Sequence, residues 1–451
     1  MSPSKQPVVA IIGAGLTGLT TAFYLKKAGI RVHLFEKADR VGGVIKTHCE
    51  NDFIFESGPN TGVLSHPEAV QLFEDLGNNC KQEIADQAAK SRWIWKSGRW
   101  EPLPSGLIGG ITTPLFTFPD KIRLLGEPFR KRGVNPDETL KELVLRRMGK
   151  SFLDYAVDPF ILGIYSGDPA RLVTKYALPK LYRLEQEFGS FIGGSIKKSR
   201  IPKTDWEKKA TREIFSVSGG LQNLIDALKQ YIGSENISLN RTVIVHKEGD
   251  FNFLIENEYF SHVISTTGAY ELIKLIPFLN SEKMKLINQL EYAKVVQVSL
   301  GFREWAGLKL NAFGGLVPSK ENHNLLGILF LSSFLKNRAP ENGALLSVFL
   351  GGVRNPEMVN LPDHRILAIV EKEFKEMMRL EKFIPDLVKI FRYQHAIPQY
   401  GIESKEKLAA ISDLEKTHPG LFLAGNIRDG IGMADRIRQG RTLARQIANK
   451  P

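Results

Sequence analysis

The chain has 451 residues, of which 43% are hydrophobic and 24% charged, and its formal net charge at pH 7 is +12. This is the composition of an ordinary globular protein, and its length predicts two or three domains. We expect a cytoplasmic protein, because the sequence shows no long apolar run, no secretory signal at residues 1–7 and no metal or redox motif around Cys49 and Cys80.

The positive charge is compatible with nucleic acid, an anionic membrane surface or an acidic substrate. Basic residues are densest at 146–150 and 197–212, in stretches without a nucleic-acid-binding motif. Such stretches are most often solvated faces, so no nucleic-acid partner is expected. Peripheral contact with the inner face of an anionic membrane remains a minority hypothesis.

The strongest local pattern covers residues 8–36. An apolar run at 8–12 predicts a buried strand, a helical pattern continues to about residue 27, and residues 31–35 predict a second strand that ends at Glu36. Three glycines in GxGxxG spacing separate the first strand from the helix: Gly13, Gly15 and Gly18.

This arrangement predicts a dinucleotide site. The glycines permit a tight turn, a close approach of the backbone to a pyrophosphate and close helix–strand packing, while the helix N-terminus attracts the phosphates. Glu36 lies where a carboxylate accepts bonds from ribose hydroxyls, which favours NAD or FAD over NADP. An ordinary glycine turn in a parallel sheet is the alternative.

Two further loops suit the same ligand. Gly42 and Gly43 follow the second strand and allow another close backbone approach, with Arg40 nearby to offset negative charge. Residues 53–61 predict a strand that enters a rigid Gly58-Pro59 turn, a shape suited to lie against a flat ring.

The rest of the chain divides into segments that differ in composition and in predicted secondary structure. Helical patterns, prolines and phenylalanines fill residues 105–209, including expected helices at 137–148 and 152–155. Strands are expected at 242–245, 262–266, 295–302, 325–331, 345–350 and 420–426, and helices at 68–76, 221–228, 366–378 and 434–449. The final strand and helix most simply complete the parallel sheet begun at Val8, with the helix N-terminus toward the ligand.

The predicted fold is therefore α/β, with a Rossmann-like dinucleotide-binding domain built from discontinuous segments. That domain is expected at residues 1–88, 210–268 and 408–451. An α+β substrate domain would comprise 89–104 and 269–407, and residues 105–209 would form a mostly helical, membrane-facing insert.

Several longer motifs resemble the FAD-dependent protoporphyrinogen oxidases, within the wider flavin amine oxidase superfamily, over almost the whole chain. GAGLTGL, RVGGVIKT, ESGPNT and LFLAGN are shared across the superfamily. Motifs that look specific to the porphyrinogen oxidases are DPFILGIYSGDP, LEQEFGSFIGG, FSVSGGLQ, GGLVPSKE, FLGGVRN and AIPQY.

The resemblance implies non-covalent FAD and a set of site residues. Substrate contacts are implied for Arg92, which would pair with a propionate, and for the apolar positions Gly163, Leu316, Leu329 and Phe349. FAD contacts are implied for Gly13, Ala14, Gly15, Leu16, Thr17, Gly18, Glu36, Lys37, Arg40, Gly42, Gly43, Val44, Gly58, Pro59, Asn60, Thr61, Val243 on the adenine side, Gly425, Asn426, and Ile431, Gly432 and Met433 at the flavin end. Plain sheet core is the alternative for the leucines and Phe349, and a surface position for Arg92.

The implied reaction oxidises protoporphyrinogen IX to protoporphyrin IX in three two-electron steps, each moving a hydride to flavin N5, with O2 as the acceptor that yields peroxide. The flavin does the chemistry, so no catalytic side chain and no metal are expected. Coproporphyrinogen III oxidation is the nearest alternative. An amine oxidase is less well matched, because Gln297 stands where those enzymes keep a lysine. A non-catalytic protein that binds FAD and porphyrin is the third alternative. The oligomeric state is left open, with a homodimer as one option.

Overall fold

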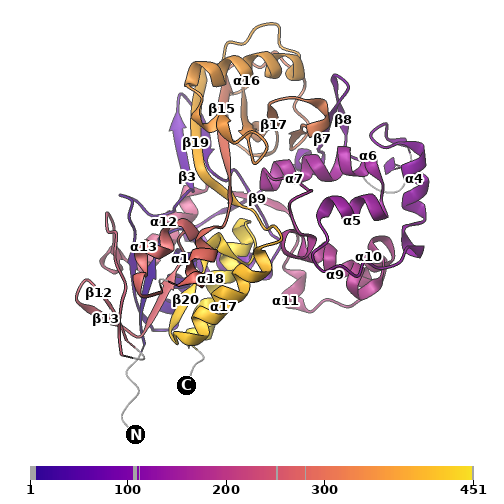
Figure 1. Ribbon diagram of the computed structural model, residues 1–451. Helices are drawn as coiled ribbons and strands as arrows, with labels where there is room; N and C mark the ends of the chain where they lie inside the picture. Colours follow the sequence, from indigo (N-terminus) through magenta and orange to yellow (C-terminus); the bar gives the residue numbers. More distant parts are fainter. Residues whose placement is uncertain (1–6, 105–108, 111, 250–251, 280, 449–451) are drawn as a thin grey trace.

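The computed structural model describes residues 7–104, 109–110, 112–249, 252–279 and 281–448. Residues 1–6, part of the stretch in which no secretory signal was expected, and Asn449, the expected end of the last helix, lie outside this described part. Figure 1 shows a lower body built on a parallel sheet, an upper sheet covered by helix α16, and a helical part on the right.

A five-stranded parallel sheet forms the centre of the lower body, in the order β10-β2-β1-β14-β20. Its strands are β1 (Val8–Ile12), β2 (Arg31–Phe35), β10 (Ile237–Ser238), β14 (His262–Ser265) and β20 (Leu421–Leu423). The segments at both ends of the chain meet here, because β20 extends the sheet begun by β1 through β14. This confirms the predicted Rossmann-like core and its completion by the C-terminal strand.

Alternate residues of β1 enter two different cores, as expected for a strand buried on both faces. Val9 and Ile11 pack against α1 (Leu16–Lys27), α12 (Gln222–Ile232) and α18 (Met433–Ala448). Ala10 and Ile12 face the antiparallel sheet of β11 (His246–Glu248), β12 (Asn252–Ile255) and β13 (Glu258–Phe260), together with α13 (Leu272–Leu275), α14 (Glu282–Asn288) and α17 (Ser404–Thr417).

Helices α1 and α18 pack backbone against backbone. A Cβ atom at Gly440 would lie 2.8 Å from the carbonyl oxygen of Thr17 and 2.8 Å from Cβ of Thr20, so only glycine permits this approach. The contact places the N-terminal ends of both helices at the same edge of the parallel sheet.

A seven-stranded sheet forms the upper body, in the order β19-β15-β18-β17-β16-β7-β8. It consists of β7 (Trp93–Lys96), β8 (Arg99–Pro102), β15 (Tyr292–Phe302), β16 (Gly314–Leu316), β17 (Leu325–Leu329), β18 (Ala344–Gly351) and β19 (Leu387–Pro398). All neighbours pair antiparallel except β16 and β7. Helix α16 (Asp363–Met378) covers one face through a core that includes Val348, Leu350 and Phe374. The opposite face, which we call the open sheet face, carries Leu316, Leu329 and Phe349.

The described part of residues 109–209 is helical. Its helices are α4 (Phe118–Leu125), α5 (Leu140–Arg147), α6 (Lys150–Phe152), α7 (Asp158–Tyr165), α8 (Thr174–Ala177), α9 (Pro179–Phe188), α10 (Phe191–Ser199) and α11 (Asp205–Lys208), with a π-helical turn at Leu153–Val157. Buried Arg147 connects them, because it pairs with the carboxylates of Glu127 and Glu185. Removing one of these partners would leave a buried charge unpaired and would destabilise the packing of the helices.

Smaller elements connect these parts. They are β3 (Lys46–Glu50), β4 (Phe53–Ser57), β5 (Gly62–Val63), β6 (Gln82–Ile84), β9 (Ile214–Val217), α2 (Pro67–Leu76) and α15 (Leu331–Phe334).

The sequence predicted most elements but not all of their limits. The strand expected at 242–245 is wrong, because this segment is irregular and the strand begins at His246. Its valines are nevertheless buried in the core, where Val245 donates a backbone hydrogen bond to the Leu275 carbonyl, 2.8 Å. The helix expected at 137–148 begins only at Leu140, because Thr139 and Glu142 form a capping box.

Replacing Gly440 by alanine tests the α1–α18 contact. We expect the free energy of unfolding to fall by about 1–3 kcal/mol, because the backbone of α1 must move to admit the methyl group. Chemical denaturation of Gly440→Ala and of a control at an exposed position of the same helix, Arg445→Ala, measures the effect. Equal stability of the two variants would contradict the close packing.

Candidate functional site

The glycine turn between β1 and α1 lies at the carboxyl edge of the parallel sheet. The Gly13 N–H donates to the Phe35 carbonyl over 2.8 Å, and a Cβ at Gly18 would lie 2.1 Å from the Gly13 carbonyl oxygen. In contrast, a Cβ at Gly15 would meet no atom within 4 Å. Gly18 is therefore required by packing, and Gly15 borders open space at the N-terminus of α1.

Glu36 follows β2 and turns back over this loop. Its carboxylate accepts the Ala14 N–H over 2.7 Å and the Ala38 N–H over 2.9 Å. Two backbone donors occupy only part of the accepting capacity of a carboxylate, so ribose hydroxyls remain acceptable donors.

Two other predicted loops reach the glycine turn. The Gly42 N–H donates to the Ala14 carbonyl over 2.8 Å, and a Cβ at Gly43 would lie 3.3 Å from Cα of Gly15. Gly58 approaches its neighbour more closely, because a Cβ there would lie 2.3 Å from the Val44 carbonyl oxygen. Three glycine-containing loops that are separate in the sequence therefore lie against one another.

Arg40 holds the second loop together. Its guanidinium donates to the carbonyl oxygens of Val41, Gly43 and Ile45 over 3.1, 2.6 and 2.9 Å. The side chain thus fixes backbone next to the predicted pyrophosphate position, in addition to carrying positive charge.

The C-terminal turn completes the edge. The Thr266 hydroxyl donates to the Gly13 carbonyl over 2.9 Å, and a Cβ at Gly425 would lie 2.7 Å from the Thr266 carbonyl oxygen. Buried Arg436 then donates to the carbonyls of Arg428 and Gly430, and Tyr400 donates to those of Asn426 and Gly430. These bonds fix the turn before α18, where Ile431, Gly432 and Met433 lie.

The remaining predicted cofactor positions differ in their surroundings. Lys37 is largely exposed and pairs with Glu271 at 2.7 Å. Asn60 is buried, and its Oδ1 accepts the Ser347 hydroxyl over 3.1 Å. Val243 is buried in the irregular segment beside Glu36, where the Arg241 N–H donates to the Glu36 carbonyl.

The site fits a dinucleotide. Besides the open space at Gly15, the buried Thr17 hydroxyl in the first turn of α1 has no hydrogen-bond partner among the described residues. A buried polar group normally has a partner, and a phosphate at the helix N-terminus would supply an acceptor.

Three of the predicted substrate positions, Leu316, Leu329 and Phe349, lie on the open sheet face, whereas Gly163 lies in α7. Strand pairing aligns Gln297, Phe349, Gly327, Leu316 and Ile94 in one row across five strands. In β16, β17 and β18 all residues are buried except three, which are half-exposed: Leu316, Leu329 and Phe349. Leu316 and Leu329 also pack against apolar clusters, so the substrate role of these positions stays a prediction.

Arg92 precedes Ile94 on the same face and is half-buried. Its guanidinium carbon lies 5.3 Å from the centre of the Phe313 ring, and no carboxylate among the described residues pairs with it. Burial lowers the pKa of Arg92 from its ordinary value. A buried cation without a counter-ion favours an anionic ligand.

The other half of the open sheet face is polar and buried. Gln297 donates from Nε2 to the Glu56 carbonyl over 2.8 Å and accepts the Gly58 N–H over 3.2 Å. Gln297 therefore fixes the Gly58 loop and is not free to act as the lysine of an amine oxidase.

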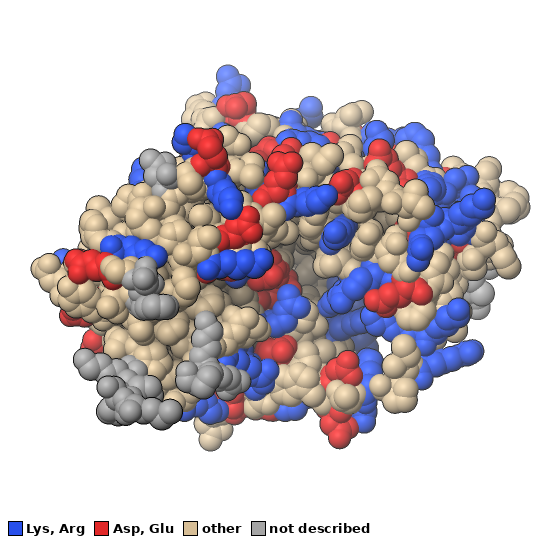
Figure 2. All heavy atoms as spheres, turned by 60° about the horizontal axis from the view of Figure 1, so that its bottom comes forward, with Lys and Arg blue, Asp and Glu red and all other residues tan. Residues whose placement is uncertain are grey.

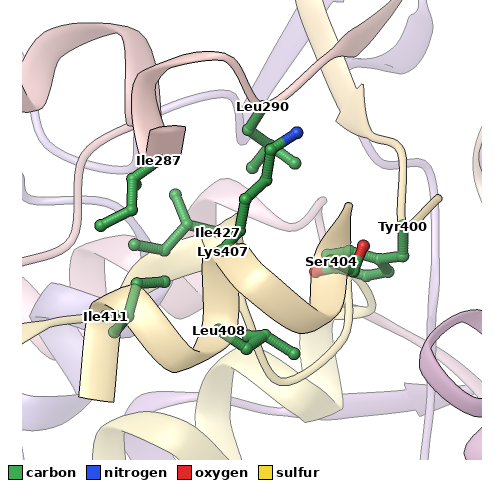
Figure 3. Close-up of a pocket in the computed structure, with 8 residues that line it drawn as sticks. All are labelled: Ile287, Leu290, Tyr400, Ser404, Lys407, Leu408, Ile411 and Ile427. Atoms are coloured by element: carbon green, nitrogen blue, oxygen red, sulfur yellow. The ribbon is translucent and has the colours of Figure 1, made fainter. Parts of the chain in front are cut away.

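A small apolar pocket lies elsewhere, between α14 and α17, as Figure 3 shows. Its volume is about 10 Å³, enough for one water molecule but not for a macrocycle. Tyr400 lines it and also supports the turn before α18. In the described part of the chain, His, Cys, Asp and Glu side chains do not gather in the groups of three or more that a metal ion requires.

Sequence reasoning missed the residues that support the site from behind. Thr266 and Arg436 lie outside the motifs quoted above, and Tyr400 ends the AIPQY motif without an assigned role. All three donate to backbone carbonyls, which for Thr266 and Tyr400 are distant in the sequence and for Arg436 are nearby. A carbonyl leaves no signal in a single sequence.

The comparisons with known proteins agree with this geometry. Residues 16–448 match the family model of the flavin containing amine oxidoreductases. The mitochondrial protoporphyrinogen oxidase of Nicotiana tabacum is 32% identical over 97% of this chain and 94% of its own length. The coproporphyrinogen III oxidase of Bacillus subtilis is 26% identical over 98% of this chain and 97% of its own length. The resemblance inferred from the motifs is thus confirmed.

Solved structures show the same fold. A protein from Exiguobacterium sp. 255-15, assigned as a protoporphyrinogen oxidase, has a TM-score of 0.81 at 22% identity and covers 99% of both chains. Reduced UDP-galactopyranose mutase has a TM-score of 0.72 at 17% identity, over 98% of this chain and 95% of its own. Together these findings confirm the α/β fold class and FAD as the cofactor, and they show that this chain belongs to the flavin containing amine oxidoreductase family.

Proposed function

We propose that this protein oxidises protoporphyrinogen IX to protoporphyrin IX, with O2 as the electron acceptor. The observation that carries the proposal is the open sheet face, where three partly exposed apolar side chains lie with Arg92, which pairs with no carboxylate of the described residues. A porphyrinogen combines a large apolar ring with carboxylate arms, and this face offers the complement of both. The mitochondrial protoporphyrinogen oxidase relative supports this choice.

In this proposal Leu316, Leu329 and Phe349 contact the ring, Gly163 of α7 lies beside it, and Arg92 pairs with a propionate. When bound, FAD accepts the electrons of each oxidation and passes them to oxygen. The chain orients the ring, excludes water and fixes the backbone N–H groups around the cofactor. No acid–base side chain is assigned a catalytic role.

The FAD positions are likewise proposals. Residues 13–18 and Glu36 would hold the pyrophosphate and ribose, residues 40–44 and 58–61 would line the cofactor, Val243 would lie on the adenine side, and residues 425–426 and 431–433 would face the flavin. The three-domain division with its predicted limits also stays a proposal. So does a homodimer, which light scattering after gel filtration tests.

Coproporphyrinogen III is the second candidate substrate, favoured by the Bacillus subtilis relative. It carries more carboxylates, so it requires more than one cation near the open sheet face. Arg92 supplies one such cation, next to Phe313.

Two glycine variants test the cofactor loop. Gly15→Ala should fold with normal stability but lose FAD, because its methyl group enters open space next to the proposed pyrophosphate. Gly18→Ala should lose stability as well, because its methyl group meets the Gly13 carbonyl. Flavin absorbance per protein and thermal unfolding measure both, with Gly126→Ala in the helical part as control. Full FAD content in Gly15→Ala would refute the assignment.

The substrate assignment is tested by following porphyrin fluorescence in air with protoporphyrinogen and coproporphyrinogen. We expect a preference for protoporphyrinogen and, in Arg92→Met, a KM increase of about ten- to hundredfold, the effect of one charge-assisted hydrogen bond. Arg99→Met, on the neighbouring strand and 64% exposed, is the matched control.

Other outcomes separate the alternatives. A preference for coproporphyrinogen would keep the fold and the reaction class but change the substrate. FAD-loaded protein that turns over neither porphyrinogen would favour an amine substrate or a non-catalytic role in porphyrin binding.

We also propose peripheral contact with an anionic membrane through the helical part. On α4 and the following turn, Phe118, Ile122, Leu125 and Phe129 recur at helical spacing and are 74, 53, 61 and 90% exposed. Exposed cations accompany them, including Lys131, Arg132, Lys197 and Lys198, and Figure 2 shows Lys and Arg gathered on the side of the helical part. An exposed apolar face beside basic residues is typical of interfacial helices. None of the described helices has the length and apolar character needed to cross a bilayer.

Liposome flotation tests this contact. The wild-type protein should float with vesicles that contain phosphatidylglycerol, less so at high salt, whereas the double variant Ile122→Asp, Phe129→Asp should stay at the bottom. Ile384→Asp changes a side chain that is 72% exposed outside the helical part and should float like the wild type. Wild-type protein that never floats would exclude the contact.

A further inference from the structure

Helix α7 lies opposite the open sheet face. Figure 1 shows it between strands β7 and β17 and helix α5. A Cβ at Gly163 would lie 2.6 Å from Cδ2 of Leu316, so this side of α7 faces the sheet in close contact with the Leu316 side chain. Phe160 and Ile164 share that side of the helix and are 40 and 42% exposed. The separation of α7 from the sheet therefore decides what fits between them.

The N-terminal end of α7 is fixed by Asp158. One carboxylate oxygen accepts the Ser319 N–H over 2.7 Å, and the other accepts the Ser319 hydroxyl over 3.0 Å. The same oxygen lies 2.9 Å from Nη2 of Arg354. Ser319 follows β16, the strand of Leu316, so these bonds join the start of the helix to the sheet.

The C-terminal end of α7 is fixed by the same arginine. Ser166 ends the helix in the left-handed conformation, with φ of 46°, and its carbonyl accepts the Val353 N–H over 2.9 Å. Two residues later, the Asp168 carboxylate lies 3.2 Å from Nη2 of Arg354 and accepts a hydrogen bond from its Nε over 3.4 Å. A single guanidinium thus contacts carboxylates before and after one helix.

Arg354 also follows strand β18, which carries Phe349. Its side chain is 31% exposed, so its ion pairs are partly shielded from solvent. Burial opposes its charge, but the carboxylates of Asp168 and Asp158 outweigh that effect and raise the pKa of Arg354 above its ordinary value. The guanidinium is therefore held between the two carboxylates as a permanent charge.

We propose that Arg354 is a positioning residue that sets the spacing between α7 and the open sheet face by bridging Asp158 and Asp168, and that this spacing governs how tightly the porphyrinogen ring is bound. This inference rests on the proposed function for the identity of the ligand. The planar guanidinium of arginine suits this bridging role, because two carboxylates at different angles require separate N–H donors. A lysine offers one ammonium group and would hold only one end of the helix firmly.

The test compares Arg354→Gln and Arg354→Lys with Arg392→Gln. Arg392 is a matched control, because it is 30% exposed, lies on β19 of the same sheet and pairs at 2.6 Å with Asp363 of α16. We expect Arg354→Gln to raise the KM for protoporphyrinogen about tenfold while kcat changes less than about twofold, because binding geometry is lost and the reacting groups are untouched. Arg354→Lys should lie between the wild type and Arg354→Gln.

A second readout does not depend on turnover. Protoporphyrin binding, followed by quenching of tryptophan fluorescence, should weaken by the same factor in Arg354→Gln, whereas FAD content and melting temperature should stay near those of Arg392→Gln. If Arg354→Gln fails to fold, Asp168→Asn carries the test, since it leaves the bonds of Asp158 to Ser319 and to Arg354 in place.

The results for the Arg354 variants can be told apart from a failure of the proposed function. Active wild-type enzyme with unchanged KM and porphyrin affinity in Arg354→Gln would overturn the positioning role, as would equal losses in Arg392→Gln. Wild-type protein inactive on both porphyrinogens would overturn the proposed function instead. A combined variant Arg354→Gln, Asp168→Asn no worse than Arg354→Gln alone would confirm that the two residues act as one unit.

Discussion

The close packing of α1 on α18 is the contact on which the site depends. The glycine turn before α1 lies within the first twenty residues of the chain, and α18 lies within the last twenty. The N-terminal ends of both helices must meet at the same edge of one sheet. Gly440 permits this because the Thr17 carbonyl occupies the space of a side chain. Two helix N-termini are thereby directed at one region, where negative charge on a dinucleotide is favoured. A larger residue at this position would separate the two ends of the site without touching any ligand.

A second constraint comes from glycine-containing loops that lie against one another. Gly58 approaches Val44 and Gly425 approaches Thr266 at distances that a side chain would prevent, and Gly43 lies in tight contact with Gly15. The cofactor region is therefore walled by backbone. Backbone walls present N–H groups in fixed directions, and they explain why glycines recur in the predicted cofactor loops.

The sequence predicted what local pattern and spacing encode. The βαβ unit with Glu36, the sheet strands with their alternating or continuous apolar runs, and the C-terminal strand all follow from periodicity. The strand prediction at 242–245 was wrong, because buried valines give the same hydrophobic pattern in an irregular segment as in a strand. The roles of supporting residues such as Thr266 and Arg354 were not predicted, because their partners are a carbonyl and carboxylates brought close only by tertiary structure.

The open sheet face combines two environments in a single row of paired residues. At the Gln297 end, amide and hydroxyl groups bond to the loop after β4, so the face is polar, buried and rigid. At the Leu316 end, apolar side chains are half-exposed and face α7. Phe349 pairs directly with Gln297 and lies at the boundary. A flavin above the polar half and an apolar ring above the other would meet at Phe349. Under the proposed function, this order of residues along one register row would set cofactor and substrate side by side. Gln297, at the position where the resemblance implies a lysine in amine oxidases, would then hold the loop after β4 in place.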